Sequence, residues 1–403
     1  MAVVTTRVTF DWIQLAVALG AVQGLLLAGA LLAHRTNRVA NRLLAALMVA
    51  FSVSLAAVPY YANDLPRTYP HLFGFSYPLP WVYGPLLYLY TLAASDRAWS
   101  FRRRHALHFA PVVAVVLLTL PIYLMSGAEK IALFDRLQAG EVPAVIAALD
   151  PTKYLSGLSY SAATVVHLRR HRRRILDSYS NTERVNLRWL LALAGAGAAI
   201  WVLATAIDAA GFFPGGGQPR GEHLVSLAVA LLVYAIGYMG LRQPEIFRYD
   251  APPPEPPAES TRPEPAQDQE VAPSAEADQR PQRTGLGEHE ATRLKAALLA
   301  LMAREHLHRD SELTLAGLAE RLDTTPHKLS ELLNSELGQT FYDFVNGYRV
   351  DEVRRRLAEP KAKHLSVLTL AMDAGFASKS TFNDVFKKRT GQTPSTYRRS
   401  LAG

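Results

Sequence analysis

The chain has 403 residues, a formal net charge of +8 at pH 7 and no cysteine. Its length predicts two or three domains, and the lack of cysteine excludes a disulfide framework, a thiolate metal site and redox sensing by thiols. The positive charge suits either DNA or an anionic membrane surface and does not distinguish them. Long uncharged runs extend to about residue 245, and amphipathic helical patterns follow near the C-terminus. This division predicts a membrane part followed by a soluble part.

Seven apolar runs in the first part are candidates for membrane-spanning helices, because a helix of about 20 residues crosses the hydrocarbon core of a bilayer. They are residues 10–33, 43–61, 72–94, 107–125, 154–168, 187–213 and 224–241. The first run is not a cleaved signal peptide. It is too long, no basic cluster precedes it, and His34, Arg35 and Arg38 follow it as a stop-transfer flank. The fifth run is short and rich in Ser, Thr and Tyr.

The basic residues of the connecting loops predict the orientation of this bundle. The loops after the first and third runs hold three and four Arg, and seven Arg lie between Arg169 and Arg188, after the fifth run and at the start of the sixth. The alternate loops hold one, three and one basic residues. Cytoplasmic loops carry the excess of Lys and Arg, so the N-terminus is expected outside and the C-terminus in the cytoplasm. Without the fifth run this agreement is lost. We interpret the Arg cluster at residues 169–174 as a topology determinant at anionic headgroups rather than a nucleic-acid site.

The longest outer loop, residues 126–153, is too short for an extracellular sensor domain. It contains an amphipathic piece, residues 131–149, which is expected to lie on the membrane surface or to cap the bundle. Any signal must therefore be read by the bundle, by the bilayer or by a partner protein.

The third run carries an unusual density of helix breakers, namely Pro78, Pro80, Gly84 and Pro85. Breakers leave carbonyl groups that protein or water must satisfy, which fits a ligand cavity. A kinked packing helix is the other interpretation, and it is the one that we favour. The candidate ligand-binding residues are Tyr77, Trp81, Tyr83 and Asp208. Asp208 is either a functional intramembrane acid or an interfacial residue beside a Gly-rich loop.

The sequence predicts no catalytic chemistry, no cofactor and no metal. It has no phosphate loop, no Gly-rich nucleotide site and no nucleophile elbow. His105 and His108 have a spacing that suits a metal, but no third ligand accompanies them.

Residues 250–285 are dense in Pro, Glu, Ala and Gln and separate the two parts of the chain. Such a segment cannot bury a core, so a disordered linker is expected. At about 3.1 Å per residue it would reach roughly 100 Å, which is long enough for a membrane-held protein to lie on DNA.

Residues 367–398 show the pattern of a helix-turn-helix. The apolar residues Val367, Leu370, Ala371 and Ala374 recur at helical spacing. Gly375 ends this first helix and Ser378 is the expected N-cap of the second. Phe382 and Phe386 lie four apart on its inward face, and Gly391 ends it. An upstream copy at residues 315–338 has the same layout, with Thr325 as N-cap and Pro326 at the first helical position.

The segment GFASKSTFNDVFKKRTGQTPSTYR, residues 375–398, resembles the signature of the AraC-type family of bacterial transcription factors. That family carries two helix-turn-helix units joined by a long helix, for which residues 341–357 are the candidate. The resemblance covers about residues 286–399. The run GPLLYLY at residues 84–90, followed by RRRHALHFAP, is also similar to the membrane part of some multi-pass AraC-type regulators. It identifies no ligand.

Each recognition helix is expected to enter the major groove with its N-terminal half at the base edges. The candidates in the first unit are His327, Lys328, Ser330, Glu331 and Asn334. Those in the second unit are Lys379, Ser380, Asn383 and Asp384, with Lys387, Lys388 and Arg389 nearer the phosphates. Asn pairs with adenine, Lys with guanine, and an acid accepts from cytosine. Glu331 and Asp384 depart from the family, where basic or neutral residues are common. They either read cytosine or orient neighbouring Lys and Arg, and we favour the second interpretation.

These patterns predict an all-α protein: a seven-span transmembrane bundle (residues 1–249), a linker (250–285) and a domain of two helix-turn-helix units (286–403). The predicted function is that of a one-component transcriptional regulator in the bacterial cytoplasmic membrane. Its expected partners are double-stranded operator DNA, the lipid bilayer, a second protomer and an unknown small-molecule or protein signal. The alternative is a membrane receptor or transporter-like protein whose tail is a nonspecific or protein-interaction module.

Overall fold

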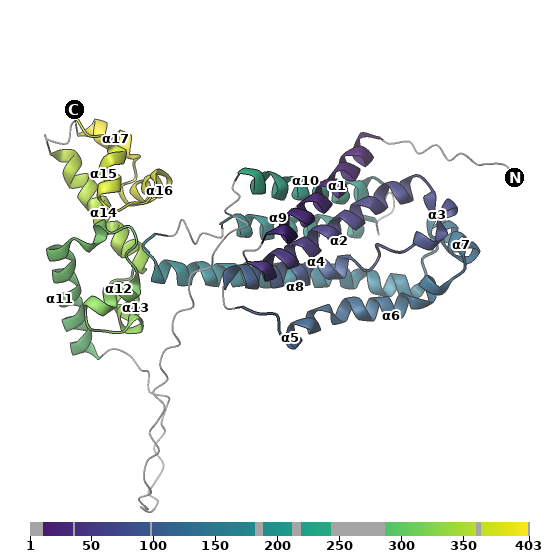
Figure 1. Cartoon of the computed structure of the whole chain (residues 1–403), viewed down its shortest axis with the longest axis horizontal. Helices are drawn as coiled ribbons and strands as arrows, with labels where there is room; N and C mark the ends of the chain where they lie inside the picture. The colour runs from purple at the N-terminus through teal and green to yellow at the C-terminus, as the bar shows by residue number, and fades with distance from the viewer. Residues whose placement is uncertain are drawn as a thin grey trace, which may run out of the picture. The chain divides into compact units, whose positions relative to one another are not determined.

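The computed structural model describes residues 11–34, 37–96, 99–181, 188–211, 219–242, 287–359 and 364–401 (Figure 1). Within these ranges the regular secondary structure is helical, and one isolated antiparallel bridge joins Tyr179 to Thr314. The predicted all-α class is confirmed. The chain divides into two compact units. The first comprises Met1–Arg169 with Leu187–Pro254, and the second Arg170–Asn186 with Glu255–Gly403. The predicted linker at residues 250–285 lies outside the described residues.

Long helices make up the first unit. They are α1 (Trp12–Ala33), α2 (Arg38–Ala62), α4 (Pro80–Ser95), α6 (Ala110–Leu124), α8 (Ala144–Ser178, of which the last nine residues belong to the second unit), α9 (Arg188–Gly211) and α10 (Pro219–Arg242). Short helices lie between them: α3 (Leu65–Thr68), η1 (Pro70–Leu72), α5 (Arg103–Ala106), η2 (Leu107–Phe109) and α7 (Gly127–Gln138). Each of the seven predicted spans overlaps one long helix. The number that cross a membrane stays a prediction.

Four of the described helical segments are long and apolar enough to cross a membrane. They are Trp12–Ala33, Arg38–Ala62, Arg103–Leu124 and Trp189–Ala210, while His223–Met239 is apolar but shorter. Helix α1 also exposes large apolar side chains, including Leu25 and Leu26. A continuous apolar surface of this kind suits a lipid environment better than water.

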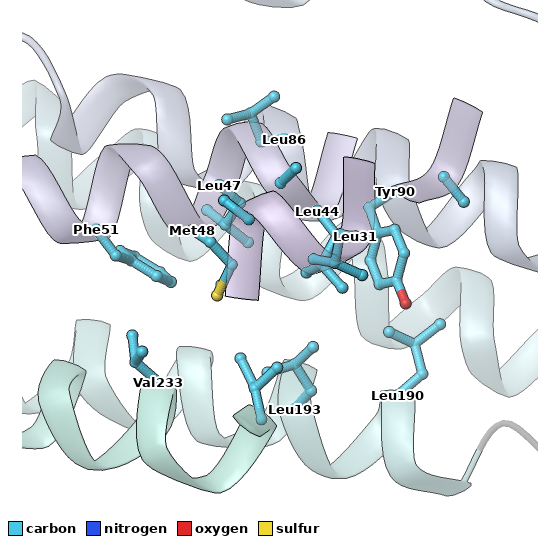
Figure 2. Close-up of a cluster of buried hydrophobic side chains, with 14 of the residues drawn as sticks. Leu31, Leu44, Leu47, Met48, Phe51, Leu86, Tyr90, Leu190, Leu193 and Val233 are labelled. Carbon is cyan, nitrogen blue, oxygen red and sulfur yellow. The ribbon is translucent and has the colours of Figure 1, made fainter. Parts of the chain in front are cut away.

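The core of the first unit lies where α1, α2, α4, α9 and α10 meet (Figure 2). Its labelled members are Leu31, Leu44, Leu47, Met48, Phe51, Leu86, Tyr90, Leu190, Leu193 and Val233. Small residues on α1 allow this close packing. Gly24 lies so close to Ser52 on α2 that a Cβ would clash with the hydroxyl, and a Cβ at Gly20 would lie 3.1 Å from that of Ala230 on α10. Small residues at helix contacts are typical of membrane bundles.

Two segments of the first unit are interrupted where the sequence showed one run. The third run, residues 72–94, holds a long helix that begins only at Pro80. Proline is well suited to the first turn of a helix, because it has no N–H to pair there. The amphipathic piece at residues 131–149 is not continuous. It breaks at Gly140, whose φ of 85° ends α7, and resumes in α8.

The second unit contains α11 (Glu288–Glu305), η4 (Leu307–Arg309), α12 (Leu315–Arg321), α13 (Pro326–Ser335), α14 (Phe341–Ala358), α15 (Val367–Asp373), α16 (Lys379–Thr390) and α17 (Pro394–Ser400). These helices form two small cores that share α14. Phe341, Phe344 and Val345 of α14 enter the first core, and Val350, Val353 and Leu357 enter the second. The predicted pair of helix-turn-helix units with a long joining helix is confirmed. The contribution of α11 to the first core was missed.

Candidate functional site

The second helix-turn-helix is built by local signals. The Ser378 hydroxyl accepts a hydrogen bond from the Thr381 N–H at 3.2 Å, so Ser378 is the N-cap of α16. Gly375 forms the turn with φ of 97°, and a Cβ there would lie 2.8 Å from the Arg309 carbonyl oxygen and closer still to that of His308. Only glycine satisfies both the backbone angle and the space. Gly391, with φ of 75°, caps the C-terminus of α16.

Helix α16 has one buried aromatic face and one exposed polar face. The rings of Phe376, Phe382, Phe386 and Tyr397 follow one another with centroids 5.2–5.4 Å apart in edge-on arrangements. These contacts fix the rotation of the helix. The opposite face therefore presents the side chains predicted to meet DNA: Lys379, Ser380, Asp384, Lys387, Lys388 and Arg389 are exposed, and Asn383 is half-buried.

Helix α13 repeats this layout. Thr325 accepts from the Lys328 N–H at 3.3 Å and Pro326 occupies the first turn, as predicted. Leu329, Leu332 and Leu333 are fully buried. Of the predicted contact residues, His327, Lys328 and Asn334 are exposed, and Ser330 and Glu331 are partly exposed. Both predicted recognition helices thus present the predicted residues on an accessible face.

Three of the cations predicted to contact DNA, namely the base-edge candidate Lys328 and the phosphate candidates Lys388 and Arg389, form ion pairs in the DNA-free chain. Lys328 pairs with Glu290 at 2.6 Å, Lys388 with Asp343 at 3.1 Å and Arg389 with Asp351 at 2.9 Å. All six side chains are at least 40% exposed. Such pairs contribute about 0–1 kcal/mol, so phosphates can replace the carboxylates at little cost.

Glu331 and Asp384 form no ion pair with any residue that the structure describes. The favoured interpretation, in which they orient a neighbouring Lys or Arg, therefore gains no support from the DNA-free geometry.

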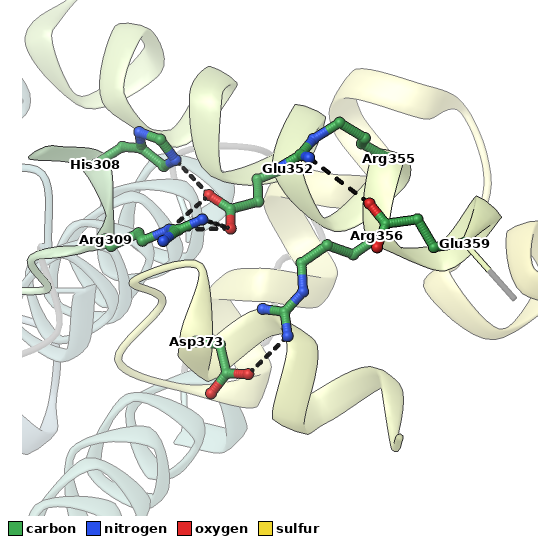
Figure 3. Close-up of polar contacts among 7 residues, drawn as sticks. All are labelled: His308, Arg309, Glu352, Arg355, Arg356, Glu359 and Asp373. Carbon is green, nitrogen blue, oxygen red and sulfur yellow. Dashed lines mark hydrogen bonds and ion pairs between the residues drawn. The ribbon is translucent and has the colours of Figure 1, made fainter. Parts of the chain in front are cut away.

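A buried charged cluster connects α14 to the turn before α12 (Figure 3). Glu352 accepts from His308 Nε2 at 2.6 Å and from Arg309 Nη2 at 2.7 Å. Burial favours a higher pKa for Glu352, but the hydrogen bonds from Arg309 and His308 outweigh it and hold its pKa below the usual value. Burial lowers the pKa of His308. The cluster fixes η4 on the joining helix, close to the turn at Gly375.

This cluster was not predicted from the sequence. Glu352 lies 44 residues from His308 in the chain, so no local spacing relates them. The sequence signal that could have indicated the cluster is Glu352 itself, an acid on the same side of the joining helix as buried Val residues.

The first unit contains a partly open cavity of about 590 Å³. Three of the four candidate ligand residues, Tyr77, Tyr83 and Asp208, line it. Trp81 does not line it. That side chain is 1% exposed, and its Nε1 donates to Thr152 Oγ1 at 3.0 Å. A cavity therefore lies beside the third run, although a kinked packing helix was the favoured interpretation, and Trp81 lies outside the lining of the cavity.

The charged groups of this cavity, together with Tyr77, lie at equivalent helix ends. Tyr77 precedes the N-terminus of α4, Asp150 and Lys153 are near the N-terminus of α8, and Asp208 is near the C-terminus of α9. In the predicted topology all these ends face outside. Tyr77 donates to Asp150 at 3.2 Å, and Lys153 pairs with the same carboxylate at 3.2 Å. The remaining lining is mostly apolar, with Phe51, Leu87, Leu193, Ile200, Val229 and Leu232 among it.

The two histidines with metal-like spacing have other partners. His105 stacks on Trp99 with ring centroids 4.9 Å apart, and its Nδ1 accepts from the Arg102 N–H at 3.0 Å. His108 Nδ1 lies 2.9 Å from the Tyr160 hydroxyl. Within the part of the chain that the structure describes, no group of three His, Cys, Asp or Glu side chains is placed to hold a metal.

Comparison with known proteins agrees with the geometry of the second unit. Residues 318–400 match the family model described as a helix-turn-helix domain, of the AraC type. The C-terminal region of this chain is an AraC-type helix-turn-helix domain. The match covers α13 to α17 and most of α12, so it includes both recognition helices of this AraC-type domain.

The relatives found by sequence are regulators, and those described here align with about a quarter of this chain. An uncharacterized HTH-type transcriptional regulator, YtdP, of Bacillus subtilis is 34% identical over 23% of this chain and 12% of its own length. The HTH-type transcriptional regulator CdhR of Pseudomonas aeruginosa is 32% identical over 26% of this chain and 30% of its own. The arabinose operon regulatory protein of Escherichia coli is 29% identical over 22% and 30%. The chain thus spans less than a third of these relatives. No solved structure matches it.

Proposed function

We propose that this chain is a one-component transcriptional regulator embedded in the bacterial cytoplasmic membrane, which reads operator DNA through α13 and α16. The observation that carries the proposal is the pair of N-capped helices, each with a buried apolar face and an exposed polar face, mounted on one joining helix. Two such helices in an AraC-type domain suit two successive major grooves.

The geometry of α14 determines how DNA would be engaged. At about 1.5 Å per residue its 18 residues extend roughly 27 Å, whereas successive major grooves are about 34 Å apart. Tilting of the domain or bending of the DNA makes up the difference. In this proposal Lys379 and Asn383 contact base edges, while Lys387, Lys388 and Arg389 contact phosphates. A homodimer would cover four grooves.

The proposed sensor is the bundle cavity, and its lining suggests the chemical class of the signal. A mostly apolar wall with charged groups gathered at the predicted outer helix ends fits an organic molecule with an apolar body and a charged end. The Asp150 and Lys153 pair and Asp208 would recognise that end. The predicted orientation, with the N-terminus outside and the AraC-type domain in the cytoplasm, allows an external signal to reach DNA.

The test is selection of genomic DNA fragments by the full-length chain in lipid nanodiscs at two salt concentrations. We expect a compact two-part motif that survives the higher salt, since base contacts are less sensitive to salt than phosphate contacts. Binding that disappears with salt and yields no motif would refute the proposal. It would instead favour a membrane receptor or transporter-like protein with a nonspecific or protein-interaction tail.

A further inference from the structure

Arg349, on the joining helix α14, is 1% exposed, and every N–H group of its guanidinium is hydrogen-bonded within the second unit. Nε donates to the His308 carbonyl at 2.7 Å, and Nη2 to the Asp310 carbonyl at 2.7 Å. Nη1 donates to Asn346 Oδ1 at 3.1 Å. Nη1 also donates to the Ser180 carbonyl oxygen at 3.2 Å, and Nη2 also donates to the Ser180 hydroxyl at 3.2 Å. Ser180 is thus a partner from a distant part of the chain.

Ser180 is itself 1% exposed and uses all of its polar groups. Its hydroxyl donates to the Leu313 carbonyl at 2.6 Å, and its backbone N–H points to the same oxygen at 3.4 Å. Its carbonyl accepts a second hydrogen bond, from Asn346 Nδ2 at 3.0 Å. The neighbouring residue Tyr179 forms the antiparallel bridge with Thr314. We call the surroundings of Ser180, namely Leu313, Asn346 and Arg349, the serine socket.

The socket is incomplete without Ser180. The hydrogen-bond partners of Arg349 named above are neutral oxygens, and burial lowers the pKa of Arg349 to about 10, which leaves it charged at neutral pH. Removing Ser180 would leave guanidinium N–H groups and an amide N–H of Asn346 unpaired in a buried site. A buried charge that loses partners is strongly destabilising. The AraC-type domain therefore needs a segment that lies outside the family match.

The position of this segment in the chain indicates its role. Ser180 follows the end of α8 at Ser178, in the Arg-rich loop that the charge pattern places in the cytoplasm. The same helix carries Asp150, Lys153 and Tyr160, which line the bundle cavity. One continuous helix thus begins at the proposed sensor and ends two residues before the socket.

We propose that residues 178–181 are a built-in docking peptide of the AraC-type domain, and that the serine socket is the site through which the bundle controls DNA binding. The docked segment completes the environment of Arg349, and so holds α14, η4 and the turn before α12 in one arrangement. Release of the segment loosens that arrangement and weakens operator binding. The control role rests on the proposed function, whereas the docking itself does not.

The absence of native cysteine permits a direct test of docking in the full-length chain. Tyr179 and Thr314 form an antiparallel pair. The hydrogen bond beside them runs from the Ser180 N–H to the Leu313 carbonyl, so Tyr179 and Thr314 are a non-hydrogen-bonded pair. The Cα atoms of such a pair are about 4.5 Å apart. That spacing suits a disulfide. The double variant Tyr179→Cys/Thr314→Cys should therefore form an intramolecular disulfide under mild oxidation.

The control pair is Tyr179→Cys/Ser400→Cys, because Ser400 is exposed on α17 in the other half of the domain. We expect the first pair to form its disulfide at least ten-fold faster than the control pair. The rate is measured as the loss of free thiols and the shift in gel mobility. Equal rates, no closure of the first pair, or a disulfide formed only between two chains would overturn the docking proposal. Thr314 is the N-cap of α12, so the single variant Thr314→Cys reports the loss of that cap separately.

Operator affinity then tests control. We expect Ser180→Leu, which cannot fit the socket, to weaken operator binding at least three-fold, and the exposed substitution Ser400→Leu to leave it unchanged. The oxidised Tyr179→Cys/Thr314→Cys protein should bind at least as tightly as the parent. Unchanged binding by Ser180→Leu would overturn the control role even if the disulfide forms. If no variant binds operator DNA, the proposed function fails, while the disulfide rates still decide docking.

Discussion

Glu352→Gln is the substitution that tests the buried cluster of the AraC-type domain most directly. The side chain is 5% exposed and accepts hydrogen bonds from His308 and Arg309. The amide keeps the shape but removes the charge and turns one acceptor into a donor that faces these two donors. Breaking a fully buried ion pair costs about 3–5 kcal/mol. Because the Arg309 side chain is 48% exposed, solvent screening reduces this figure, and we expect about 2 kcal/mol.

Glu359→Gln is the matched control, since it makes the same chemical change just beyond the end of the same helix (Figure 3). Glu359 pairs with Arg355 at 3.6 Å, and both side chains are about half exposed or more. A surface pair of this kind contributes less than about 1 kcal/mol. The two substitutions therefore share their chemistry and differ in burial.

The assay is hydrogen exchange of α14 peptides in the full-length chain, read by mass spectrometry. A loss of about 2 kcal/mol corresponds to roughly 30-fold faster exchange, given that each 1.4 kcal/mol is about ten-fold. Glu359→Gln should change the rate by less than about five-fold. Equal changes in the two variants would refute the reasoning, because they would show that burial of the Glu352 cluster adds nothing to the stability of this helix.

Three further predictions follow from the same geometry. Burial lowers the folded-state pKa of His308 from 6.5, and the hydrogen bonds that Glu352 accepts from Arg309 and His308 lower the folded-state pKa of Glu352 from 4.5. The unfolded domain therefore binds more protons than the folded domain. Exchange protection of α14, corrected for intrinsic rates, should fall as the pH drops below about 6.5 and further below about 4.5, and constant protection from pH 7 to 4 would contradict this. Gly375→Ala should destabilise the domain by about 2 kcal/mol or more, because the new Cβ would clash with backbone atoms at a position whose φ is already positive. Gly338→Ala, at φ of 63° in open space, should cost about 1 kcal/mol. Thermal unfolding that ranks the two variants the other way would show that the surrounding backbone relaxes to accommodate the Cβ. Asn383→Ala and Lys379→Ala should each relax base preference at one half-site by about 1–3 kcal/mol, and uniform weakening on every sequence would identify them as phosphate contacts.

The helix-turn-helix units were predictable because their signals are local. Ser378 and Thr325 cap the helices they precede, Gly375 and Gly391 supply positive φ, and Phe382 and Phe386 are one helical turn apart. Each of these interactions is made within a few residues, so the sequence window that contains the motif also contains its cause. The roles of individual residues at DNA stay predictions, because no nucleic-acid contact follows from a helix face alone.

In the first unit the sequence located the helices but not all of their limits. Apolar runs overlap every long helix of the first unit, and Pro80 and Gly84, two of the breakers, line a cavity that the favoured interpretation, a kinked packing helix, did not include. Where α4 begins depends on the preference of proline for a first turn, and the wall of the cavity depends on which side of α4 faces the neighbouring helices. Trp81 was misplaced for that second reason, because a side chain's direction is fixed only by packing.

The sequence by itself determined the helical class, the two helix-turn-helix units and the division between an apolar and an amphipathic part, since these follow from composition and short-range spacing. Only the tertiary structure decided the contacts of the buried polar groups. Glu352 meets His308 across 44 residues of chain, and Arg349 meets Ser180 across 169. Such partners have no common pattern in the sequence. They are selected because a buried charge must find donors or acceptors once folding has removed water from it.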